Sequence, residues 1–133
     1  MTFDIEKLID NALKARESAY TPYSNFKVGA AIYLKSGEYI LGCNIENKSY
    51  SMTMCAERCA LFKLISDGFN KDDVLAMAIV GDTKEPITPC GACREVMDEL
   101  LNPDTLVVLA NLERKTRIIT VKELLPLSFK LES

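Results

Sequence analysis

Three cysteines and one glutamate in this chain have the types and spacing needed to build a metal site. Residues 55–57 read Cys-Ala-Glu, and residues 89–93 read Pro-Cys-Gly-Ala-Cys. On a helix, Cys90 and Cys93 would be surface neighbours, so their sulfurs could reach one metal ion at about 2.3 Å each. Pro89 suits the start of such a helix, where its missing N–H is no loss. Because the chain contains no histidine, a metal site of this kind must use thiolates.

A C-x-x-C pair alone is also typical of a redox pair or of half a structural zinc site. The combination of C-x-E with a later P-C-x-x-C is more specific, because it is the signature of zinc deaminases, in which the glutamate is not a ligand. Three protein ligands leave the fourth zinc position open for water, as catalytic sites do. We therefore predict that Cys55, Cys90 and Cys93 bind a catalytic zinc ion. The alternatives are a redox pair and a closed structural site with Cys43 or Cys59 as the fourth ligand.

Glu57 and a neighbouring arginine could complete the chemistry of such a site. A carboxylate beside zinc-bound water can accept a proton and pass it to a leaving nitrogen. The alternative for Glu57 is an acid that complements the dipole of a first helical turn. Three thiolates on Zn²⁺ leave a net charge of about −1, which weakens the metal as a Lewis acid. Two helix N-termini and Arg58, or less favourably Arg94, could offset that charge; either arginine could instead form a surface ion pair.

The composition indicates a globular domain that acts on small molecules. The chain has 133 residues, 48% of them hydrophobic and 26% charged, so we expect a single domain over 1–133. The net charge of −3 and the scattered Lys and Arg argue against binding to nucleic acid. No apolar run approaches the roughly 18 residues of a membrane span. The sequence begins with acidic residues where a signal peptide would have basic ones, so we expect a cytoplasmic protein. In that compartment, five cysteines indicate metal binding or catalysis rather than disulfides.

Hydrophobic periodicity predicts the elements that position these residues. Helical patterns cover 4–20, 55–67, 89–101 and a short piece before Pro126, and β-prone runs cover 26–37, 38–47, 75–82, 105–112 and 116–121. The resulting order α-β-β-α-β-α-β-β-α predicts an α/β fold with a sheet covered by helices. The runs 26–37 and 38–47 form a hairpin around 35–38, and Gly68 ends the second helix. The runs 75–82 and 105–112 should be central, because they are apolar on both faces.

The chain resembles the cytidine deaminases of the small, homotetrameric class that acts on free nucleosides. The matching blocks are PYSNFKVGAAI, GCNIEN, CAER, PCGACREVM and TVKELLPLSF. The resemblance implies a three-layer α/β/α fold with a mixed five-stranded sheet, one Zn²⁺ per subunit, and a homotetramer with active sites near subunit interfaces. It also implies hydrolysis of cytidine and 2′-deoxycytidine to uridine and 2′-deoxyuridine, with release of ammonia, in pyrimidine salvage. Zinc-bound hydroxide would attack C4, with Glu57 as the proton shuttle.

The same resemblance implies roles for further residues. Asn44 and Glu46 match ribose 3′-hydroxyl ligands, and an amide and a carboxylate two positions apart on a strand end could share one face. The other implied residues are Phe26 and Ala56 at the substrate, Phe129 reaching a neighbouring subunit's site, and Tyr50 at the subunit interface. The segment KSYSMTM, residues 48–54, lacks the proline and glycine usual in the family, so the local loop shape should differ.

Two rival functions follow from the same residues. A deaminase of an aminoglycosyl nucleoside antibiotic such as blasticidin S also uses three cysteines, but the intact CNIEN segment favours ordinary nucleosides. A zinc-stabilised module without enzymatic activity would need Cys43 or Cys59 to close the site.

Overall fold

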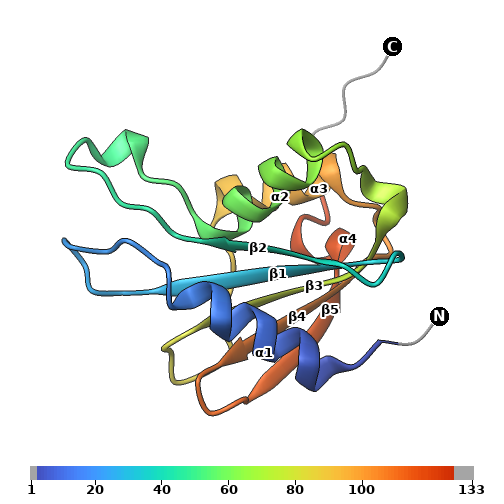
Figure 1. Ribbon diagram of the computed structural model, residues 1–133, viewed down its shortest axis with the longest axis horizontal. Helices are drawn as coiled ribbons and strands as arrows, with labels where there is room; N and C mark the ends of the chain where they lie inside the picture. The colour runs from blue at the N-terminus through green and yellow to red at the C-terminus, as the bar shows by residue number, and fades with distance from the viewer. Residues whose placement is uncertain (1–2, 128–133) are drawn as a thin grey trace.

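The computed structural model describes residues 3–127 and contains one mixed sheet of five strands (Figure 1). The strand order is β2-β1-β3-β4-β5. The strands are β1 (Val28–Leu34), β2 (Tyr39–Cys43), β3 (Val74–Gly81), β4 (Leu106–Asn111) and β5 (Thr116–Thr120). Among the five strands of the described residues, only β3 and β4 pair in parallel; the other neighbouring strands are antiparallel. The mixed five-stranded sheet is therefore confirmed, and both β3 and β4 lie inside it as predicted.

Helices cover both faces of the sheet, which confirms the three layers (Figure 1). The helices are α1 (Ile5–Arg16), α2 (Ala56–Ser66), α3 (Gly91–Leu100) and α4 (Val121–Leu124), and short 3₁₀ turns cover Tyr50–Met52 and Lys71–Asp73. On one face α1 packs against β1 and β3, and on the other α2 and α3 lie side by side. None of the helices in the described part of the chain has both the length and the apolar character needed to cross a membrane.

The first helix ends earlier than its sequence predicts. The helical pattern extends to Tyr20, but α1 stops at Arg16. The backbone of Tyr20 is instead engaged with the segment after β2: its N–H donates to the carbonyl of Asn44, and its own carbonyl accepts from Glu46. This non-local pairing satisfies the main-chain groups that a longer helix would have used, so it wins over local helix propensity.

Two glycines mark where helices approach the β1–β2 hairpin most closely. Gly29 lies against Ala12 and Arg16 of α1, and Gly42 lies against Ala56 and Ala60 of α2. A Cβ atom on Gly42 would sit 2.5 Å from the Ala60 nitrogen and 2.7 Å from the Ala56 oxygen. Because these are backbone atoms of a helix, no side-chain rotation could relieve the overlap.

Gly42→Ala is therefore expected to displace the start of α2. Overpacking against backbone should lower the free energy of unfolding by about 2 kcal/mol or more, measured by urea denaturation. Gly91→Ala is the control, because a Cβ there meets no atom within 4 Å beyond its chain neighbours and the nearby backbone of its own helix. Equal stability of the two variants would contradict the close approach of β2 and α2.

Candidate metal centre and pocket

The three cysteines lie at the N-termini of two neighbouring helices. Cys55 is the N-cap residue of α2, Cys90 is the N-cap residue of α3, and Cys93 lies in the first turn of α3. Neither cap side chain bonds the helix backbone, so both thiols remain available for other contacts. The packing of α2 against α3 brings the two caps together.

The sulfur atoms are close enough to share one ion. The Cys55 and Cys90 sulfurs are 3.7 Å apart, those of Cys90 and Cys93 are 3.2 Å apart, and all three lie within 4.8 Å of one another. A tetrahedral zinc ion with Zn–S bonds of about 2.3 Å would hold its sulfurs about 3.8 Å apart. The three thiols thus fit zinc. Within residues 3–127, Cys43 and Cys59 are not part of this cluster, which argues against the closed four-cysteine site.

The thiols differ strongly in acidity. The pKa of Cys55 is lowered to about 5, first by its interaction with the Cys93 thiol and then, against the opposing effect of burial, by a hydrogen bond from Arg58. Its interaction with Cys55, followed by burial, raises the pKa of Cys93. Of the two groups, Cys55 is the one that Arg58 directly supports as a thiolate.

Only one of the two candidate arginines contacts a thiol in the described part of the chain. Nη2 of Arg58 donates to the Cys55 sulfur at 3.3 Å. Arg94 instead donates through Nε to the Pro89 carbonyl at 2.9 Å and through Nη1 to the Leu124 carbonyl at 3.2 Å. Arg94 thus secures the loop before α3 and the end of α4, while Arg58 is placed to offset thiolate charge.

A pocket of about 200 Å³ opens beside the cluster. Glu57 lines it together with Cys55 and Cys90, and its side chain is only 5% exposed. Burial raises the pKa of the Glu57 carboxyl above its ordinary value. The predicted residues Phe26, Asn44 and Ala56 also line this pocket, and lining residues that the sequence analysis missed are Val28, Thr53, Met54, Ile87 and Thr88.

Asn44 and Glu46 do not line the same pocket. The Asn44 amide accepts from the Val28 N–H at 2.9 Å and donates to the Phe26 carbonyl at 2.8 Å, so it fixes the backbone at the pocket edge. The Glu46 carboxylate accepts from the backbone of Tyr23 and Ser24 and lines an adjacent pocket of about 340 Å³. Their shared role at a ribose hydroxyl stays a prediction.

The resemblance implies that two residues, Tyr50 and Phe129, contact neighbouring subunits. Tyr50 is 89% exposed and lines the adjacent pocket that contains Glu46. Phe129 lies outside the residues that the structure describes, so its predicted role is untested.

Residues 3–110 match the family model described as the cytidine and deoxycytidylate deaminase zinc-binding region. The chain is 56% identical over 129 residues to the cytidine deaminase of Halalkalibacterium halodurans, covering 97% of this chain and 96% of that protein. It is 51% identical to the cytidine deaminase of Sporosarcina psychrophila, covering 97% of this chain and 93% of that protein.

Solved structures of cytidine deaminases are similar to this chain as well. The crystal structure of cytidine deaminase from Burkholderia pseudomallei matches 96% of this chain and 100% of its own, with 48% identity and a TM-score of 0.93. That of cytidine deaminase from Mycobacterium tuberculosis matches 98% of this chain and 100% of its own, with 38% identity and a TM-score of 0.81.

Proposed function

Because this chain belongs to the cytidine deaminase family, we propose that it hydrolyses cytidine to uridine and ammonia, with one zinc ion per subunit. The observation that carries the proposal is the cluster of three thiols opening on a pocket that also holds a buried glutamate. Water supplies the oxygen that replaces the amino group at C4, so no redox partner is needed. A dithiol redox pair uses two thiols, so it would not be expected to bring three together as this cluster does.

Cys55, Cys90 and Cys93 are the proposed zinc ligands. Zinc held by three thiolates would supply Lewis-acid activation of the attacking water molecule. Glu57 is the proposed proton shuttle: it would accept a proton from the water and deliver it to the ring nitrogen N3, and would then take the proton of the new C4 hydroxyl and deliver it to the departing amine. Its position in the pocket wall beside Cys55 and Cys90 supports this assignment.

Arg58 is the proposed counter-charge for the thiolates. Arg58→Gln should lower kcat about tenfold with zinc content unchanged, because a charge-assisted hydrogen bond to the ligand sulfur is lost. Arg58→Lys keeps the positive charge and should recover part of the activity. Zinc analysis beside steady-state kinetics checks this; loss of zinc from Arg58→Gln would mean that the arginine instead serves the fold of the site.

Substrate binding is proposed to involve Phe26, Asn44 and Ala56 at the pocket, with Glu46 and Phe129 as further contacts. Asn44 and Glu46 together offer donors and acceptors for the ribose 3′-hydroxyl. Because such contacts would not require a 2′-hydroxyl, 2′-deoxycytidine is a second proposed substrate. If the Glu46→Gln variant binds a ribonucleoside as tightly as the parent does, this arrangement is contradicted.

The assembly is proposed to be a homotetramer of single deaminase domains, spanning 1–133, with active sites near the interfaces. Exposed large side chains support it, among them Met52 and also Tyr23 and Tyr50, which line the adjacent pocket. Sedimentation of fully active monomers would rule it out. We further propose a role in pyrimidine salvage in the cytoplasm, where three thiolate ligands would stay reduced.

The direct test measures metal content per chain together with ultraviolet-monitored conversion of cytidine to uridine. We expect about one zinc per chain and turnover that is lost on chelation. Blasticidin S serves as the comparison substrate. Turnover of blasticidin S in preference to cytidine, or zinc binding without any deamination, would overturn the proposal.

A further inference from the structure

The loop between β3 and α3, residues 82–90, forms one wall of the zinc-side pocket. Its residues Ile87 and Thr88 line the pocket, and Ile87 packs tightly on the end of β3. A Cβ atom on Gly81 would lie 2.5 Å from Cδ1 of Ile87 and 3.5 Å from Cζ of Phe26. Ile87 and Phe26 therefore both lie beside Gly81, where the missing side chain leaves room for Ile87, and the loop carries Ile87 in the pocket wall.

A buried asparagine holds this loop from the neighbouring strand. Asn111 ends β4, pairs in register with Gly81 of β3, and is only 2% exposed. Its Nδ2 donates to the Lys84 carbonyl at 2.9 Å, and its Oδ1 accepts from the Lys115 N–H at 2.9 Å. One amide therefore joins the pocket loop to the turn between β4 and β5.

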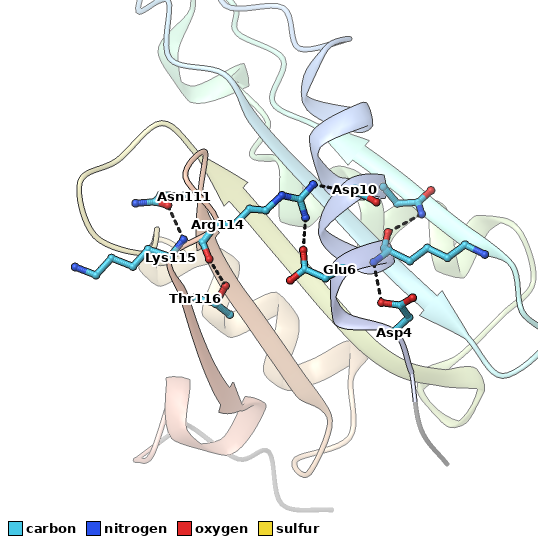
Figure 2. Close-up of polar contacts among 9 residues, drawn as sticks. Asp4, Glu6, Asp10, Asn111, Arg114, Lys115 and Thr116 are labelled. Carbon is cyan, nitrogen blue, oxygen red and sulfur yellow. Dashed lines mark hydrogen bonds and ion pairs between the residues drawn. The ribbon is translucent and has the colours of Figure 1, made fainter.

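That turn also contacts α1 through ion pairs of Arg114, as Figure 2 shows. Arg114 donates to Glu6 at 2.7 Å and also to Asp10, with its own backbone in the left-handed region at φ 66°. Lys115 forms a second link to the loop through Glu85, but both side chains are more than half exposed. An exposed ion pair contributes little, so the buried amide of Asn111 is the stronger restraint on the part of the loop at Lys84 and Glu85, while Arg94 holds the other end at the Pro89 carbonyl.

We propose that Asn111 is a positioning residue for cytidine deamination: by holding the Lys84 carbonyl, it sets the loop so that Ile87 closes the pocket against Gly81 and Phe26. The inference rests on the proposed function. Asn111 does not line the pocket itself, so it acts on the substrate through the loop, at Ile87. An amide is suited to the task, because it donates to one carbonyl and accepts from one N–H at the same time.

Asn111→Asp tests this role most directly. The carboxylate keeps the acceptor for the Lys115 N–H but turns an oxygen toward the Lys84 carbonyl, so the link to the loop is lost. We expect kcat/KM for cytidine to fall about tenfold, mainly through a higher KM, with zinc content unchanged. If this variant does not fold, Asn111→Ser, which is too short to hold Lys84, is measured by the same criteria.

A double-mutant cycle with Ile87→Ala separates positioning from general destabilisation. If Asn111 acts through Ile87, its replacement should matter less once Ile87 is gone. In the Ile87→Ala variant, Asn111→Asp should therefore lower kcat/KM by less than about threefold, against about tenfold in the parent. Independent effects would multiply, and a purely structural role would lower the melting temperature while leaving KM unchanged. Either result overturns the inference.

Asn102→Asp is the control for the same change away from the pocket, because the partly buried Asn102 donates to the Lys71 carbonyl and the Asp72 carboxylate, just before β3 begins. It should keep the wild-type KM. A wild-type enzyme that does not turn over cytidine would contradict the proposed function instead. A wild-type KM for Asn111→Asp in an active enzyme would contradict only the positioning role.

Discussion

Glu57→Gln is expected to bind zinc as the parent does and to deaminate cytidine about 10³-fold more slowly or worse. Glutamine keeps the size and hydrogen-bonding shape of glutamate, so α2 should retain its packing. It has no carboxylate to accept a proton from water or to return one to the leaving amine. Zinc analysis and the ultraviolet assay on one preparation give both quantities. Because Glu57 is buried, a melting curve should accompany them.

The matched control is Glu95→Gln, which makes the same change on the exposed side of α3. It should retain parental kcat and KM. If Glu57→Gln deaminates cytidine at the parental rate, the glutamate has no catalytic role and the proposed proton path fails. Loss of zinc from Glu57→Gln would instead indicate that the residue supports the metal centre.

Cys90→Ser is expected to abolish stable zinc binding and with it all measurable turnover, on the order of 10³-fold or more. Cys90 is exposed, so the substitution should leave the core packing of α3 intact. Only Cys55 and Cys93 would remain as thiolate ligands, and two thiolates hold zinc far more weakly than three. Metal analysis after gel filtration and circular dichroism distinguish loss of metal from loss of fold.

Cys59→Ser provides the comparison. Cys59 lies one turn beyond Cys55 on α2 but is not part of the sulfur cluster. We expect this variant to keep about one zinc per chain and most of its activity. If Cys59→Ser lost zinc and Cys90→Ser kept it, the ligand set proposed above would be wrong.

Much of the fold follows from local sequence pattern. The hairpin around 35–38, the glycine after α2, and the alternation of helices and strands are all local features, and the structure confirms them. The end of α1 was predicted wrongly, because Tyr20 pairs with residues more than twenty positions away. The two short 3₁₀ turns were also missed, since turns of three residues carry no periodic signal.

The candidate site also has some residues that the sequence predicts and others that it does not. The cysteines and Glu57 could be found because each motif falls within a few residues, and helix geometry then fixes their spacing. The places of Met54, Ile87 and Asn111 could not be predicted, because they depend on contacts between residues distant in sequence: an isolated bridge between Ile45 and Met54, the course of the loop 82–90, and the pairing of β3 with β4. An apolar residue three positions before a zinc-site cysteine was the only available signal for Ile87.

The glycines of the β1–β2 hairpin limit how this enzyme could be redesigned. Gly29 and Gly42 leave no room for added volume between the hairpin and the helices on either side. Attempts to widen substrate scope by enlarging side chains there should yield misassembled protein. Ile87, Thr53 and Met54 line the cavity directly, so directed evolution would find its useful diversity in the two segments that carry them.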